Sequence, residues 1–245
     1  MKGMQVAMED MARGFRTAEA TRKTEDAVTR RFSERTVIFE PDDEGARAVY
    51  ITSGWAMTYK VLPGGTRVVT DFLLSGDVIS KTAAQLAQET IYALTDVSCC
   101  EWPDVLSDDA ERVSGLSRRL RLEMLKRQAR MSERLANIGR RDVLERTGHL
   151  LLELAVRSRD FAKPTFDGFI CPLRQADIGD AVGLSTVHVN RVLKDMRMRG
   201  LVWFRNGLVE FPDRQRLIEM VGFEDDYLLP GTASSYGDGA RRPHS

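Results

Sequence analysis

The sequence predicts an α+β fold in which an antiparallel β-roll is followed by a long helix, two short helices and a β-hairpin. Five short β-rich runs separated by turn clusters precede Pro103, and a helical apolar stripe follows it. Further on, two helix-like segments meet at a glycine, and an Asn-Gly pair then joins two β-rich runs. A chain of 245 residues is long enough for one large or two modest domains.

The charge of the chain is balanced in total but unevenly distributed. Lys and Arg number 36, as do Asp and Glu, and taken alone this zero sum argues against a nucleic-acid binder. Residues 36–109, however, carry 4 basic and 12 acidic side chains, a net charge of −8, whereas residues 110–139 carry 8 and 3, a net charge of +5. Because binding depends on the local field, the zero sum excludes nothing about nucleic acid.

Targeting signals are not evident. No apolar run approaches the roughly 20 residues of a membrane-spanning helix. The first residues, MKGMQVAMEDMARGF, contain acidic side chains where a secretory signal has its apolar stretch. We therefore expect a cytoplasmic protein with no membrane contact.

The first half of the chain predicts the roll. Residues 1–30 are expected to form a charged lead-in helix, and residues 31–109 the β-roll itself. The β-rich runs are TVIF, AVYI, WAMTYKVL, RVVTDFLL and VSCCEW, with turn clusters at 41–45, 63–65 and 75–77. Their hydrophobic alternation is only partial, which indicates that one face is solvated.

Residues 110–139 predict a dimerisation helix. Apolar residues at steps of three, four or seven form a narrow stripe, and the other positions are rich in arginine. A stripe on so long a helix requires a partner surface, and a parallel homodimeric coiled coil is the simplest. The alternative is that the stripe packs on the chain's own roll, and both can hold. The predicted dimerisation residues are Leu116, Leu120, Met124, Met131, Leu135 and Ile138.

Residues 140–229 are predicted to form a winged helix-turn-helix domain. A helix over 141–157 and a loop over 161–168 precede its central motif, and the glycine-rich residues 230–245 are expected to be a disordered tail. The first helix of the motif covers Gln175–Val182 and the second starts after Ser185, which can cap it. Gly183 can adopt the positive φ of the turn, and Gly179 lets the helices cross closely. This is the pattern of a helix-turn-helix, whose second helix enters the major groove of DNA.

The second helix and the wing supply candidate DNA contacts. Arg191 can read guanine, Asn190 adenine, and a Val187 methyl group thymine, with Thr186 and Lys194 on the same face. Residues 186–201 carry 4 basic side chains and 1 acidic side chain, a local charge of +3. In the wing, VWFR and LVEF flank Asn206-Gly207, and Arg205 is placed to touch a phosphate. The alternative is an ordinary helical hairpin with a solvated polar face.

These features together resemble the Crp/Fnr superfamily of bacterial transcription regulators. The resemblance covers residues 31–229 and is strongest in LRQADIGDAVGLSTVHVNRVLKDMRMRGLV, with GFEDDYLL at 222–229 resembling the end of one branch. It implies a cyclic-nucleotide-binding-like jelly roll and a homodimer that reads a near-palindromic site on double-stranded DNA. It also implies contact with RNA polymerase, most often as an activator. On this resemblance Ser185 and His188 would lie near the backbone phosphates.

Departures from the family pattern argue against cyclic AMP. Cyclic-AMP-binding members hold the phosphate with a Gly-Glu pair after the Gly-Asp turn and with a later Arg-Ser/Thr-Ala run. Here Ser80-Lys81 follows Gly76-Asp77, and Ala87-Gln88-Glu89 stands at the later run. Since Glu89 has the wrong sign for an anion, we expect no cyclic AMP. Many members also carry Glu where Val187 stands, so the usual half-site should not be assumed.

Other cofactors and catalysis are not expected. Three cysteines (Cys99, Cys100 and Cys171) are too few for a four-cysteine iron–sulfur or zinc site, and no histidine in the roll could bind haem. No Ser/His/Asp set, metal cluster or phosphate loop indicates an enzyme. Cys171 is a candidate redox-sensitive thiol, with a buried core residue as the alternative. The rival function is a ligand- or redox-responsive regulatory module whose winged helix contacts a protein partner.

Overall fold

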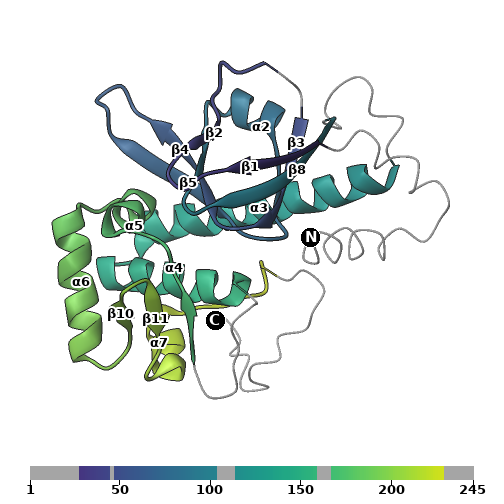
Figure 1. The fold of residues 1–245 in the computed structure, drawn as a ribbon. Coiled ribbons are helices and arrows are strands. Elements are labelled where there is room, and N and C mark those ends of the chain that lie inside the picture. The colour runs from purple at the N-terminus through teal and green to yellow at the C-terminus, as the bar shows by residue number, and fades with distance from the viewer. Residues whose placement is uncertain (1–27, 45–46, 104–113, 159–166, 229–245) are drawn as a thin grey trace.

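The computed structural model describes residues 28–44, 47–103, 114–158 and 167–228. Residues 1–27 of the predicted lead-in helix and all of the predicted tail, residues 230–245, lie outside these residues. The described part consists of a β-roll, a long helix that runs along it, and a winged helix-turn-helix unit near one end of that helix (Figure 1). No helix among the described residues has the length and hydropathy of a membrane span.

The roll consists of two four-stranded antiparallel sheets. One has the order β1-β8-β3-β6 and the other the order β2-β7-β4-β5. Its core includes Phe39, Ile51, Leu73 and Ile91, which are almost fully buried. The strands are β1 (Val28–Phe32), β2 (Val37–Phe39), β3 (Arg47–Ser53), β4 (Ala56–Val61), β5 (Arg67–Leu73), β6 (Val78–Ser80), β7 (Thr90–Ala93) and β8 (Val97–Pro103).

Each of the five β-rich runs contains a strand, but sequence patterning missed other elements of the roll. The prediction omitted β1, β6, β7 and the short helix α2 (Lys81–Leu86). Strands of three or four residues are too short to show a period of two. The first strand, VTRRF, is mostly exposed and includes two arginines, and it begins three residues before the predicted start of the roll. Its strand state depends on pairing with β8, which local sequence does not encode.

The long helix α3 (Ser114–Arg140) connects the roll to the rest of the chain. At its roll end, Leu120 is buried among Tyr50, Val78 and Cys100, and Met124 packs beside that cluster. A sharp turn leads into α4 (Val143–Arg157), which Asp142 caps in a reciprocal capping box with Glu145.

The winged helix-turn-helix unit packs around a buried cluster that it shares with the roll, from which Met57, Phe72 and Leu94 enter the same cluster. The unit contains β9 (Gly168–Ile170), α5 (Gln175–Val182), α6 (Thr186–Met198), β10 (Trp203–Arg205), β11 (Leu208–Glu210) and α7 (Arg214–Val221). Buried residues from α4, β9, α5, α6 and α7 meet in one cluster that includes Leu151, Phe169, Ile178, Val189 and Leu217. The strands form an antiparallel sheet of order β10-β11-β9.

Candidate nucleic-acid interface

Local chemistry fixes the two helices of the motif where the sequence predicts them. Gly183 has φ 69° and ends α5, and the Ser185 hydroxyl accepts a hydrogen bond from the His188 amide at 3.4 Å. A Cβ on Gly179 would lie 2.4 Å from the Leu184 carbonyl oxygen, so only glycine permits this crossing. The wing turn has positive φ at both Asn206 (52°) and Gly207 (74°), as a two-residue type I′ hairpin requires.

Helix α6 buries one face and exposes the other. Val189, Val192 and Met196 pack into the core. The predicted base-reading and phosphate-contacting side chains on this helix are all exposed: Ser185, Thr186, Val187, His188, Asn190, Arg191 and Lys194. Val187 is 69% exposed, so its methyl groups are accessible to a base. The outer edge of the unit is therefore a helix face with polar, cationic and methyl groups available for contact (Figure 1).

A basic groove of about 380 Å³ lies beside this face. Its cationic lining comes from Arg174 at the start of α5 and from Lys194 and Arg197 on α6, while Asn206 lines it from the wing. No carboxylate is among the residues that line it. Three cationic side chains around one concave surface provide the donors that phosphate oxygens accept.

Sequence reasoning named only part of this groove. The sequence predicts Asn190 and Lys194 as contacts, whereas Arg197 enters only through the +3 charge of residues 186–201. Gln175 and Asn206 were not considered as contacts. The groove forms where the start of α5, the middle and end of α6 and the wing turn converge, and a positive charge at a helix N-terminus is its one local signal in the sequence.

Arg205 does not reach this groove. Its guanidinium lies 5.3 Å from the centre of the Trp203 ring and 3.7 Å from Glu210. Phe204, the preceding residue, lines the groove, and successive side chains of a strand point to opposite faces. The predicted phosphate contact of Arg205 therefore gains no support from the structure.

The acidic residue of α6 is neutralised within its own helix. Asp195 pairs with Arg199 one turn later, with Nη2 2.9 Å from Oδ2. Ion pairs involving Arg174, Arg191, Lys194 or Arg197 are not found among the described residues. Those four cations remain available to an anionic partner.

The predicted dimerisation stripe is divided between two surroundings. Leu120 is fully buried against its own roll, so its assignment to the dimer interface was wrong, and Met124 is partly buried beside it. Towards the other end of α3, Met131, Leu135 and Ile138 are 40%, 74% and 42% exposed. The side chain of Leu116 lies outside the described residues.

An apolar groove of about 930 Å³ runs between the uncovered half of the stripe and the roll. It is lined by Val69 and Ile79 from the roll and by Leu125, Met131 and Leu135 from α3. In the second half of α3 it is Arg130 and Arg134 that contact the roll. They lie on another side of the helix from Met131, Leu135 and Ile138, and this is why a single stripe has both a covered and an uncovered part.

Where the family pattern places phosphate ligands in the roll, charged side chains of this chain pair with each other. Glu89 is buried, and its Oε2 accepts a hydrogen bond from Arg127 Nη2 of α3 at 2.5 Å. The ammonium of Lys81 lies 2.9 Å from Glu101 Oε1. The one added cation of this region thus already has a carboxylate partner, and a buried carboxylate repels an incoming phosphodiester. These residues do not fit a cyclic nucleotide.

The cysteines are buried. Cys171 is fully enclosed in the winged-helix core, and burial raises the pKa of its thiol to about 12. Because the thiolate is the reactive form, its proposed redox role gains no support. Burial, with help from the nearby Glu101 carboxylate, likewise raises the pKa of Cys99 to about 12. Within the described residues, no cluster of His, Cys, Asp or Glu could hold a metal ion.

Comparison with known proteins agrees with this geometry. Residues 29–105 match the cyclic nucleotide-binding domain family, and residues 145–220 match the Crp-like helix-turn-helix domain family. The anaerobic regulatory protein of Haemophilus influenzae is 25% identical over 191 residues, which is 76% of this chain and 73% of that protein. The transcriptional activator protein FnrA of Stutzerimonas stutzeri is 24% identical over 76% of this chain and 74% of its own.

Solved structures share the same architecture. FixK2 from Bradyrhizobium japonicum superposes with a TM-score of 0.68 at 23% identity, over 79% of this chain and 96% of that one. The fold, the exposed recognition helix and the basic groove define a winged-helix DNA-binding regulator. The chain belongs to the Crp/Fnr family of transcription regulators.

Proposed function

We propose that the chain acts in the cytoplasm as a homodimeric activator that reads a near-palindromic DNA site and contacts RNA polymerase. The observation that carries this proposal is the exposed face of α6, which adjoins a groove lined by Arg174, Lys194 and Arg197 and free of carboxylates. Activation is proposed because relatives such as FnrA are named as transcriptional activators. The family consists of regulators and not of enzymes.

Within this proposal, base reading and phosphate contact fall to different side chains. Arg191 donates two hydrogen bonds to a guanine, Asn190 pairs with an adenine, and Thr186 and Val187 meet neighbouring bases. Lys194, Arg197 and Arg174 bind phosphates, as do Ser185 and His188 at the start of α6. Those phosphate contacts fix where the helix lies in the major groove.

The dimer in this proposal forms on the uncovered half of α3. Met131, Leu135 and Ile138 are exposed there beside an apolar groove, and the same stripe on a second copy would bury them. Two recognition helices would then face two half-sites related by the two-fold axis.

We further propose that the roll works without cyclic AMP or another resident cofactor. The Glu89–Arg127 pair links the roll to α3 directly, so that contact needs no bound anion. Activity would then follow the abundance of the protein.

Substitution of Arg191 tests the readout. Arg191→Ala should weaken binding to the preferred site by about 1–3 kcal/mol and relax base choice at one position of each half-site. Lys194→Ala is the matched control, because loss of a phosphate contact should weaken binding to all sequences alike and reduce the slope of log K against log salt by about 1. Both are measured against a selected DNA pool at fixed salt. Unchanged binding by the Arg191 variant would mean that α6 does not read bases, and it would favour the protein-partner alternative.

A further inference from the structure

Strand β5 of the roll holds the DNA-binding unit at two separate places. Arg67 at its start contacts α5, and Asp71 four residues later contacts α3 and α4. At about 3.3 Å per residue, the two points are roughly 13 Å apart along the strand. One strand of the roll thus contacts the helix that supports α6 and the helix that leads into the unit.

The first attachment is an ion-pair cluster on α5. Arg67 Nε donates to Asp180 Oδ2 at 2.6 Å, and its Nη2 donates to Asp177 Oδ1 at 3.0 Å. Arg35, from another part of the roll, donates to Asp177 Oδ2 at 2.9 Å and to the Pro172 carbonyl at 3.1 Å. Burial opposes the charge of Arg67, but Asp180 and Asp177 outweigh it and raise the Arg67 pKa.

Asp177 makes this attachment specific to the position of α5. It is 2% exposed and also accepts a hydrogen bond from the Arg174 backbone amide at the start of the helix, at 2.9 Å. The same carboxylate therefore shapes the first turn of α5 and receives two arginines of the roll. Any rotation of α5 away from the roll would leave the buried Asp177 carboxylate without its arginine partners.

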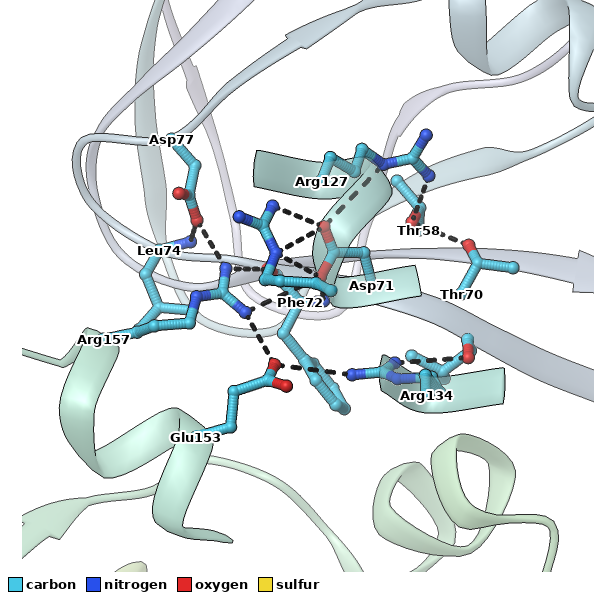
Figure 2. A network of polar contacts seen from close by, with 12 residues as sticks. Thr58, Thr70, Asp71, Phe72, Leu74, Asp77, Arg127, Arg134, Glu153 and Arg157 are labelled. Carbon is cyan, nitrogen blue, oxygen red and sulfur yellow. Dashed lines mark hydrogen bonds and ion pairs between the residues drawn. The ribbon is translucent and has the colours of Figure 1, made fainter. Parts of the chain in front are cut away.

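The second attachment is the buried network around Asp71. Figure 2 shows Arg157 of α4 reaching across to Asp71 and Asp77, and its Nη2 lies 2.8 Å from Asp77 Oδ2. Arg157 also donates to the Phe72 carbonyl at 2.5 Å. From α3, Arg130 Nη2 donates to Asp71 Oδ2 at 2.6 Å. This network fixes α3 and α4 on the roll.

The two attachments together restrict the orientation of the DNA-binding unit more than either would alone. The Asp71 network holds the unit at α3 and α4, and apolar residues of the roll such as Phe72 share a buried cluster with the unit, but neither contact is directional toward α5. The Arg67 cluster adds charge-paired hydrogen bonds to α5 itself, and these specify its orientation on the roll. Because α6 crosses α5 closely at Gly179, where a Cβ would meet the Leu184 carbonyl oxygen, α6 moves with α5.

We propose that Arg67 is a positioning residue for DNA recognition: through Asp177 and Asp180 it sets the orientation of α6, and thereby the spacing between half-sites that the dimer accepts. This inference rests on the proposed function. One base pair more or less moves the second half-site by about 3.4 Å and turns it by about 35°. A rigidly held pair of recognition helices rejects that change, whereas a pair free to swivel tolerates it.

The test compares binding to sites whose two half-sites differ in spacing. For the wild-type dimer, a change of one base pair should reduce affinity about tenfold, similar to the cost of one mismatched base pair. For Arg67→Ala the same change should reduce affinity less than about threefold. Asp180→Ala should broaden the spacing preference as well, and the double variant should be no broader than Arg67→Ala alone, because the two residues act through one contact. An unaltered spacing profile in Arg67→Ala overturns the inference.

Lys60→Ala is the matched control. Lys60 lies on β4 opposite Val68, next to Arg67, and has no ion pair among the described residues. It removes the same charge from the same hairpin without touching α5. Its spacing profile should equal that of the wild type, and Arg67→Lys should lie between wild type and Arg67→Ala.

A measurement without DNA separates this inference from the proposed function. Leu86 on α2 and Met198 at the end of α6 are 81% and 70% exposed, so cysteines introduced there accept spin labels. The native cysteines are buried and should stay unlabelled. With labelled chains diluted into unlabelled ones, the distance distribution within a chain should be narrow in the wild type and clearly broader in Arg67→Ala. An equally narrow distribution overturns the inference, whereas failure of every variant to bind DNA overturns the proposed function alone.

Discussion

Asp71→Asn tests whether the buried network at the centre of the molecule stabilises the fold. Asp71 is fully buried, and its Oδ2 lies 2.6 Å from Arg130 Nη2. Arg157 lies 3.6 Å from its Oδ1 and Arg127 3.7 Å from its Oδ2 (Figure 2). Burial alone would raise the pKa of this carboxyl, but Arg130 and Arg157 hold it well below the usual range. Asparagine keeps the shape and removes the charge.

The expected magnitude follows from which arginine loses its partner. Arg127 retains Glu89, and Arg157 retains Asp77 and Glu153. Among the described residues Arg130 pairs only with Asp71, so the variant leaves one buried guanidinium without a carboxylate. Removing one partner of a buried pair costs about 3–5 kcal/mol, a large part of the 5–15 kcal/mol that is typical of a whole domain.

Urea unfolding at pH 7 and fixed protein concentration measures this loss. The control is Asp195→Asn, which breaks a surface pair with Arg199 and should change the free energy of unfolding by less than about 0.5 kcal/mol. Adding Arg130→Met to Asp71→Asn should recover part of the loss, because it removes the stranded charge. A loss below about 1 kcal/mol in Asp71→Asn would refute the reasoning.

Two further predictions concern the dimer and its response to acid. Leu135→Glu should dissociate the proposed dimer in a mass measurement, since each protomer loses about 1.5–3 kcal/mol of apolar burial. Leu122→Glu, on the opposite side of α3, should leave the dimer intact. A Leu135 variant that remained dimeric would count against the stripe as the dimer interface. Burial and the nearby Arg141 lower the pKa of His149 and Glu133 opposes them, with a net value of about 4. The unfolded chain therefore binds the proton first, and stability should fall by up to about 1.4 kcal/mol per unit as pH drops from 6.5 towards 4. Unfolding from pH 7.5 to 4.5 should give a flatter profile for His149→Gln, and an equally steep one would exclude this histidine as the cause.

Local chemistry explains why the recognition unit could be predicted from the sequence. The bounds of α5, the turn at Gly183 and the start of α6 after Ser185 agree with the prediction because each depends on residues within a few positions. The alternation of buried and exposed residues on α6 follows from helical spacing alone. The side of the wing on which Arg205 lies depends on how the hairpin packs, and the structure places its guanidinium beside Trp203 and Glu210 and not in the groove.

The stripe on α3 shows the limit of a periodic pattern. Spacing identifies the apolar positions but not what covers each of them. Leu120 packs against the roll and Leu135 does not, since in the second half of the helix Arg130 and Arg134 face the roll instead. That difference belongs to the tertiary structure.

The charges show the same division most clearly. The sequence by itself determined that the acidic block at residues 36–109 and the basic block at residues 110–139 carry −8 and +5. It did not determine that they meet, or that Arg127 and Arg130 turn inward to Glu89 and Asp71, partners 38 and 59 residues away. Helical spacing, capping and turn chemistry act between near neighbours and can be read from the chain. The pairing of distant charges is decided only when α3 packs against the roll, because a buried charge is destabilising unless a partner of opposite charge lies beside it.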